Sequence, residues 1–173
     1  MKTAKIKLST LIRFIIVCAL GVLSHFLYNW SGQNKFVGIF TSMNESTWEH
    51  LKLIFFPILF VTIFDLVVFR KKAKALLPAR VMGILSGMIF IIVTFYTFWG
   101  ISGRIIDFIN ISIYVFGVFT AFVTEKFYCK KNIGPDLSVS IAILIAITAL
   151  FVIFSFNAPD IGIFYDLSLH PKS

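Results

Sequence analysis

Five runs of apolar residues, each close to 20 residues long, limit the folds that this chain can adopt. About 20 residues cross the roughly 30 Å hydrocarbon core of a bilayer as an α-helix. Because lipid offers no partner to an unpaired backbone group, spans of this length should be helical. Period-two alternation is absent, which argues against a β-barrel. The sequence therefore predicts an all-α membrane protein, a bundle of five transmembrane helices. The runs cover about residues 12–30, 51–69, 80–99, 105–127 and 138–156.

Composition supports this class. The 173 residues are 58% hydrophobic and only 14% charged, whereas a soluble domain has about 25% charged residues. No linker or low-complexity tract interrupts the chain, so we expect residues 1–173 to form a single integral membrane domain. The basic start resembles a signal peptide, but Tyr28, Asn29 and Trp30 occupy the place of a small-residue cleavage site. We therefore interpret the first run as a retained span.

The basic residues predict the orientation. Twelve of them fall on one side of the predicted spans and four on the other. The positive-inside rule then places the N-terminus in the cytoplasm and the C-terminus outside a cell membrane that the chain crosses several times. This pattern makes the lipid bilayer the expected partner and argues against nucleic acid. The predicted inner group is Lys2, Lys5, Lys7, Arg13, Arg70, Lys71, Lys72, Lys74, Arg80, Lys126, Lys130 and Lys131; the outer group is Lys35, Lys52, Arg104 and Lys172.

Small residues predict where helices touch. Gly83 and Gly87 form a G-x-x-x-G pair in the third span, and Gly117 and Ala121 have the same spacing in the fourth. Small side chains at this spacing let helix backbones approach closely in lipid. On the inner side, Asp65 and Glu125 stand near basic clusters, and Cys18 and Cys129 have no metal-ligand spacing. We expect the two carboxylates to form ion pairs and the cysteines to stay unpaired.

Residues 44–52, NESTWEHLK, form the most unusual stretch. Ser46 and Glu49 match a capping box, in which each side chain bonds the backbone amide of the other residue. His50 and Lys52 do not fit this explanation, because a cation in the first helical turn opposes the helix dipole. Positions that break a local rule are candidates for function.

Further polar residues reach the same predicted outer level. His25 is an ionisable residue inside the first span, on the face that carries Tyr28, and such groups are functional candidates by default. Arg104 and Asp107 open the fourth span three residues apart and can pair on one face. We therefore predict a polar ligand site at the outer helix ends. Its candidate residues are His25, Tyr28, Asn44, Glu45, Trp48, Glu49, His50, Lys52, Arg104, Asp107 and Asp166.

Three functions remain open. The first is a site that binds or moves a small polar or ionic ligand, or a lipid headgroup whose phosphate would meet Lys35, Lys52 and Arg104. The second is a scaffold or assembly subunit without chemistry, whose polar end contacts a membrane protein partner. In either case the cofactor and any catalytic residue are unknown.

The third function is a membrane-embedded metal-dependent hydrolase that uses His25, Glu45, Glu49 and His50. Its spacing is weak, because no H-E-x-x-H motif is present and the adjacent Glu49 and His50 point about 100° apart on a helix. His25 is also expected several ångströms deeper than His50. The sequence therefore assigns no metal, and whether the protein is an enzyme stays open.

Four segments of the chain match a pattern known from other proteins. They are HFLYNWSGQN, VGIF, NESTWEHLKLIFFP and a tail of the form P-x-x-x-x-F-x-D from Pro159 to Asp166. The chain resembles an uncharacterised family of small bacterial multi-pass membrane proteins. The resemblance covers residues 25–57 and 159–166 and implies a membrane fold but no activity. This chain departs from the family pattern at Ala158, where a second proline is expected.

Overall fold

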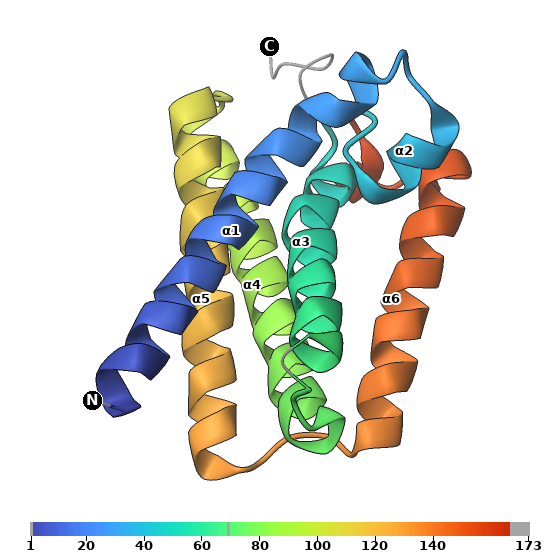
Figure 1. The fold of residues 1–173 in the computed structure, drawn as a ribbon. Coiled ribbons are helices and arrows are strands. Elements are labelled where there is room, and N and C mark those ends of the chain that lie inside the picture. The colour runs from blue at the N-terminus through green and yellow to red at the C-terminus, as the bar shows by residue number, and fades with distance from the viewer. Residues whose placement is uncertain (1, 69, 167–173) are drawn as a thin grey trace.

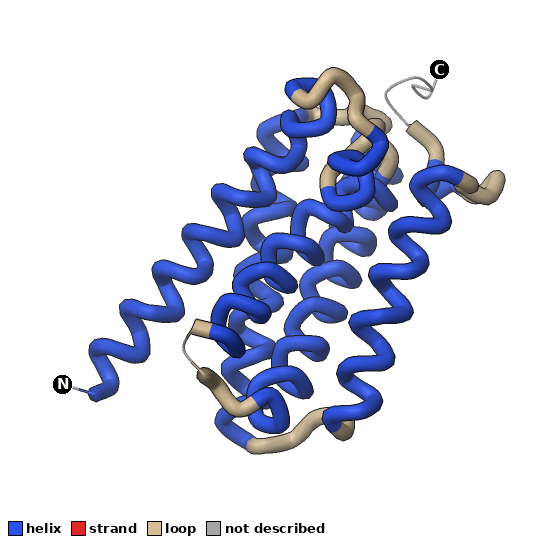
Figure 2. Tube along the Cα trace, turned by 45° about the vertical axis from the view of Figure 1, so that its right-hand side comes forward, coloured by secondary structure: helices blue, strands red, loops and turns tan. Residues whose placement is uncertain are grey.

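The computed structural model describes residues 2–68 and 70–166. These residues form helices joined by loops, and no strand occurs among them (Figure 2). Five of the helices are long and apolar enough to cross a membrane, which confirms the predicted fold class. The elements are α1 (Lys2–Trp30), α2 (Lys35–Phe40), α3 (Thr47–Val67), α4 (Ala73–Ser102), α5 (Asp107–Lys131), α6 (Leu137–Phe156) and the short 3₁₀ helix η1 (Gly162–Phe164).

Several helices begin earlier than the apolar runs predict, most clearly α1 at Lys2, α3 at Thr47 and α4 at Ala73. The α3 helix begins at Thr47 because the Ser46 hydroxyl accepts a hydrogen bond from the Glu49 amide at 3.3 Å and caps its N-terminus. The α4 helix begins at Ala73, since the alanines, leucines and lysine that follow are strong helix formers despite the charge. Arg80, which is the first residue of the third predicted run, therefore lies about two turns inside α4.

The long helices run alternately up and down, so that their loops gather at two ends (Figure 1). We call the end that holds the connection from α2 to α3 the Glu45 end, and the opposite end, with the connection from α3 to α4, the Lys71 end. The α3 and α4 helices are the most buried of the five spans. The α3 helix contacts α1, α4, α5 and α6 and is therefore the central helix of the bundle.

The contact between α4 and α5 is a seam of small residues. A Cβ added to Gly83 would lie 2.6 Å from the backbone oxygen of Ala121, and one added to Gly87 would lie 2.8 Å from the backbone oxygen of Gly117. The two backbones therefore approach each other closely, as the G-x-x-x-G spacing predicts. This confirms the predicted helix contact.

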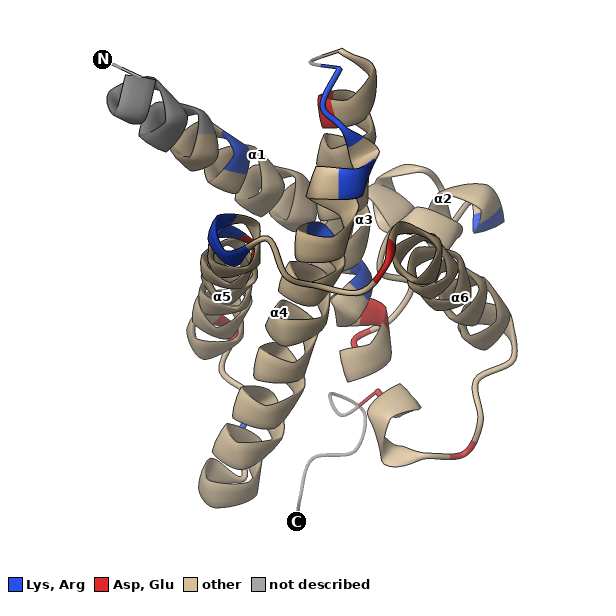
Figure 3. Ribbon diagram, turned by 90° about the horizontal axis from the view of Figure 1, so that it is seen from below, with Lys and Arg blue, Asp and Glu red and all other residues tan. Residues whose placement is uncertain are grey.

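The Lys71 end contains a buried ion-pair network. Asp65 accepts hydrogen bonds from Arg13 at 3.0 Å, Lys71 at 3.2 Å and Arg80 at 3.0 Å. Arg80 also pairs with Glu125 at 3.2 Å. These contacts join α1, α3, α4 and α5 and confirm the predicted pairing of both carboxylates. Figure 3, seen from this end, shows the surrounding Lys and Arg on the connection from α3 to α4 and at the end of α5. Both cysteines are free.

Candidate functional site

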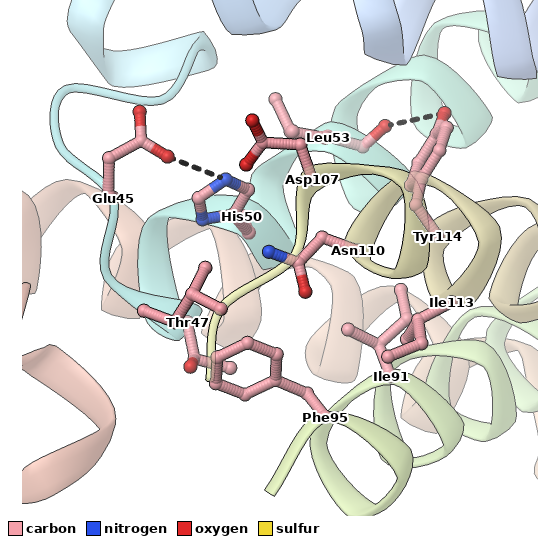
Figure 4. A pocket seen from close by; sticks show the side chains of 11 residues that line it. Glu45, Thr47, His50, Leu53, Ile91, Phe95, Asp107, Asn110, Ile113 and Tyr114 are labelled. Carbon is pink, nitrogen blue, oxygen red and sulfur yellow. Dashed lines mark hydrogen bonds and ion pairs between the residues drawn. The ribbon is translucent and has the colours of Figure 1, made fainter. Parts of the chain in front are cut away.

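Three ionisable side chains from separate elements converge at the Glu45 end. His25 comes from α1, Glu45 from the loop before α3, and His50 from the first turns of α3. The Nε2 atom of His50 lies 3.3 Å from Oε2 of Glu45 (Figure 4). Nε2 of His25 lies 3.7 Å from Oε1 of the same carboxylate. The two imidazole rings are 5.3 Å apart between centroids. We call these three residues the His–Glu–His cluster.

The meeting of the two rings corrects the expectation that His25 lies several ångströms deeper than His50. The α1 helix continues to Trp30, and its end extends beyond the start of α3 (Figure 1). A residue five positions before the end of α1 therefore reaches the level of the first turns of α3. The predicted difference in depth between His25 and His50 assumed that α1 ends and α3 begins at the same level of the membrane. In the structure these two helix ends lie at different levels.

The loop before α3 is held in place by short polar contacts. The Asn44 side chain accepts a hydrogen bond from the Ser46 amide at 2.9 Å, and the Ser42 hydroxyl donates to the Asn44 carbonyl at 2.7 Å. The Glu45 amide donates to a carboxylate oxygen of Asp166 at 3.3 Å. Asn44 and Asp166 therefore position the Glu45 backbone while its carboxylate faces the histidines.

Hydrogen bonding sets the electrostatics of the cluster. Nδ1 of His50 lies 2.9 Å from the Ser46 carbonyl, which can only accept, so this nitrogen carries a proton whether the ring is neutral or cationic. The ring therefore directs Nε2 at Glu45. When the ring is cationic, Nε2 also carries a proton and donates it to Glu45, and this hydrogen bond holds the pKa of Glu45 below its usual range, although partial burial opposes the shift. Glu45 is half-exposed, with 51% of its side chain accessible, and the carboxylate is available to a ligand.

The cluster borders two adjoining cavities of about 230 and 460 Å³. The first lies toward α4, and the second lies toward α1 and includes His25. Figure 4 shows the polar side chains around the first cavity, with the apolar Ile91 and Phe95 on its far side. The shared lining joins α5 to α3 and to the loop before it. The residues that line both cavities are Glu45, His50, Leu53, Asp107, Asn110 and Tyr114.

Tyr114 closes the inner side of these cavities. Its hydroxyl donates a hydrogen bond to the Val17 carbonyl at 2.9 Å and lies 3.3 Å from the Leu53 carbonyl. A Cβ added to Gly21 would overlap the Tyr114 hydroxyl, so only glycine at this position lets the phenol reach α1. One side chain of α5 thus ties α1 to α3 directly beneath the site.

Glu49 and Lys52 lie away from the cavities and pair with each other. Their side-chain atoms are 2.8 Å apart and almost fully buried. Lys52 also donates to the Gly38 carbonyl at 2.8 Å. Glu49 accepts from the Met43 amide and from the Ser155 hydroxyl, each at 2.8 Å. This buried pair holds the loop after α2 against α3 and α6.

The same contacts show that the predicted capping box forms only in part. The Ser46 hydroxyl does cap α3, but Glu49 does not return to the Ser46 amide. That amide already donates to Asn44, and Glu49 reaches the Met43 amide instead. The local motif is therefore only half formed, because the tertiary contacts of Glu49 are more numerous than the single bond that the box offers.

Three other predicted site residues lie away from the two cavities. Trp48 packs its ring on Phe151 and Phe164, with centroids 4.9 and 5.0 Å away. Tyr28 lies against the α2 glycine Gly38. Arg104 is exposed in the loop before α5 and, among the described residues, forms no ion pair with Asp107. None of the three lines either cavity.

The predicted site residues omit part of the observed lining. Asn110 and Tyr114 follow Asp107 at three and seven positions, which is one face of α5, and that spacing was the available signal. Thr47, Leu53 and Ile91 also line a cavity. No sequence pattern identifies them, because only the packing of α3 against α4 brings them together.

Comparison with known proteins identifies a family without an assigned activity. Residues 1–170 match a family of unknown function (DUF6512). The chain belongs to this family. No curated protein and no solved structure matches the chain. Membership of this family assigns no activity, so the side chains of the site are the evidence for a function.

Proposed function

We propose that this member of DUF6512 binds a small cationic ligand in the cavities at the Glu45 end, on the outer side of the cell membrane. The observation that carries the proposal is the convergence of His25, Glu45 and His50 on cavities that also expose Asp107. Ionisable groups inside an apolar bundle are costly and normally mark a ligand or ion path. The excess of basic residues near the Lys71 end supports this orientation.

The charge of the lining favours a cation over a lipid phosphate. Neither cavity has a lysine or arginine among its lining residues within the described ranges. The three basic residues predicted to meet a phosphate lie elsewhere. Lys52 is committed to Glu49, while Lys35 and Arg104 are exposed outside the cavities. Glu45 and Asp107 instead offer two carboxylates to an entering ligand.

Buried polar atoms around the site support a polar ligand. Nδ1 of His25, Oγ1 of Thr47 and Oδ1 of Asn110 are buried and have no hydrogen-bond partner among the described residues. Buried polar groups in proteins are almost always satisfied. A ligand with its own donors and acceptors is one way to satisfy them. Since Tyr114 closes the inner side, we propose binding at this end and not a continuous path through the bundle.

The test measures the thermal stability of purified full-length protein in detergent against opposing probes. The cations are choline, spermidine, Zn²⁺ and Ca²⁺, and the anions are phosphate and glycerol phosphate. We expect at least one cation to raise the melting temperature and the anions to have no effect. The same cation should stabilise Asp107→Asn less than the wild type. Stabilisation by phosphate, or by no cation at all, would contradict the proposal.

A further inference from the structure

We propose that His25, Glu45 and His50 bind one divalent transition-metal ion, and that Zn²⁺ fits the site best. This inference rests on the proposed cation site and names its ligand class. Each residue offers one ligand atom, and these atoms all lie within 4.8 Å of one another. The three donors come from α1, from the loop before α3 and from α3 itself, so the folded chain, and no local motif, builds the site.

The distances suit a shared ion. Two donors bound to one tetrahedral zinc, with bonds of about 2.1 Å, lie about 3.4 Å apart. Each histidine meets this condition with a different oxygen of Glu45: Nε2 of His50 lies 3.3 Å from Oε2, and Nε2 of His25 lies 3.7 Å from Oε1. The remaining pair of nitrogens lies within 4.8 Å, so the two imidazoles would move closer together on sharing a tetrahedral ion.

The orientation of His50 provides an independent argument. A histidine that binds a metal through one ring nitrogen usually donates its other N–H to a carbonyl or carboxylate, which fixes the tautomer. His50 has this arrangement, with Nδ1 at 2.9 Å from the Ser46 carbonyl and Nε2 directed at Glu45. In the neutral ring, Nε2 therefore carries the lone pair that a metal needs.

The donor set selects the kind of ion. Two imidazole nitrogens and one carboxylate suit Zn²⁺ and its neighbours in the first transition row. Mg²⁺ and Ca²⁺ prefer shells made of oxygen, so two nitrogens among three donors disfavour them. The Glu45 carboxylate balances part of the ionic charge, and Asp107 from α5 lines the same cavity.

Three protein donors leave one position of a tetrahedral ion open. The His–Glu–His cluster borders the cavity of about 460 Å³ that Asp107 and Asn110 also line. The open position therefore faces a space in which water or a second small molecule fits. Such an arrangement is typical of zinc sites that act on a bound molecule, whereas structural zinc sites have four protein ligands.

The experiment titrates Zn²⁺ into chelator-treated, full-length protein in detergent and measures binding by calorimetry, with the metal content determined by elemental analysis. We expect one equivalent of Zn²⁺ per chain and no comparable binding of Mg²⁺. His25→Ala, Glu45→Gln and His50→Gln should each weaken Zn²⁺ binding at least about tenfold. Gel filtration and the melting temperature report whether each variant is folded.

Two further measurements make the result specific. His170→Ala changes the third histidine of the chain, which lies outside the described residues, and should leave Zn²⁺ binding unchanged. Binding of Co²⁺ to the wild type should give visible absorption bands of a nitrogen and oxygen site, and this readout needs no variant of the cluster. Unchanged Zn²⁺ affinity in folded His25→Ala and His50→Gln would overturn the inference.

The outcomes also separate this inference from the proposed function. Stabilisation by choline or spermidine that depends on Asp107, without binding of Zn²⁺ or Co²⁺, would overturn the metal site and leave the cation site standing. A protein that binds no cation of either kind would overturn both. Zn²⁺ binding that is lost in the three cluster variants and kept in His170→Ala supports both.

Discussion

Glu45 and Glu49 are four positions apart in the chain, and the fold uses them differently. Glu49 is buried and its oxygens are occupied by Lys52, Met43 and Ser155. Glu45 is half-exposed and faces two imidazoles at the border of a cavity. At the scale of single residues, the buried Glu49–Lys52 pair orders the loop that presents Glu45, and of the two glutamates only Glu45 has a carboxylate that lines a cavity.

Removing Lys52 should destabilise the fold and not merely the site. Lys52→Met leaves the Glu49 carboxylate buried without its cation, which costs about 3–5 kcal/mol of unfolding free energy. Thermal denaturation in detergent measures the effect. The double variant Glu49→Gln/Lys52→Met should recover part of the loss, and Lys35→Met, at an exposed position on α2, should have no effect. A Lys52→Met protein of normal stability would show that the pair is not structural.

Acid should weaken the contact between Glu45 and His50. The pKa of Glu45 is lower in the folded protein than its ordinary value of 4.5, so the carboxylate stabilises the fold at pH values above 4.5. This contribution is lost as the pH falls through the lowered pKa. In chelator-treated protein, the melting temperature of the wild type should therefore fall more steeply below pH 4.5 than that of Glu45→Gln. Parallel curves would contradict this assignment.

At the scale of helices, the site depends on how closely neighbouring spans pack and on how far each span extends along the bundle axis. The small-residue seam brings α4 against α5, and Tyr114 then ties α5 to α1 and α3. The unequal heights of α1 and α3 place His25 beside His50 (Figure 1). The two imidazoles therefore meet because of helix packing and not because of any spacing within one helix.

The seam predicts opposite results for one substitution at two positions of α4. In Gly83→Ala the new Cβ meets the Ala121 backbone oxygen at 2.6 Å, so α4 and α5 must separate, at a cost of about 1–3 kcal/mol. Gly100→Ala places its Cβ in open space, with no atom within 4 Å, and should be neutral or slightly stabilising. Melting temperatures of both variants check this. Equal effects would show that the seam is not tightly packed.

At the scale of the whole molecule, the two ends of the bundle differ in charge chemistry. The Lys71 end has a buried network in which Asp65 pairs with Arg13, Lys71 and Arg80, and Glu125 pairs with Arg80. The Glu45 end gathers carboxylates and imidazoles around cavities that no lysine or arginine lines within the described residues. The basic residues at the Lys71 end are among those from which the orientation is predicted, and that orientation stays a prediction.

Cysteine labelling tests the predicted orientation directly. Cys129 is exposed near the Lys71 end, and Ser31 is exposed near the Glu45 end. In intact cells, a membrane-impermeant maleimide should label Ser31→Cys in a background that lacks Cys18 and Cys129. In a Cys18→Ala protein, the same reagent should reach Cys129 only after permeabilisation. The reverse pattern would place the Glu45 end in the cytoplasm.

The sequence by itself determined the fold class. Run length and the need to satisfy backbone groups in lipid set five helices, and the small-residue spacing identified the seam between α4 and α5. These properties depend on residues that are neighbours in the chain or on one helix face. They also marked His25 as an ionisable group inside an apolar span and His50 as a cation in a first helical turn, and they placed Glu45 among the candidate residues.

Only the tertiary structure decided which unusual residues act together. The motif of residues 44–52 contains Glu45, Glu49, His50 and Lys52 close together in the chain. In the fold, Glu45 and His50 line a cavity, whereas Glu49 and Lys52 are buried as an ion pair. The partners of each group come from α1, α2, α5 and α6, far away in the chain. The energy of a charged side chain depends on those distant neighbours, and residue spacing carries no information about them.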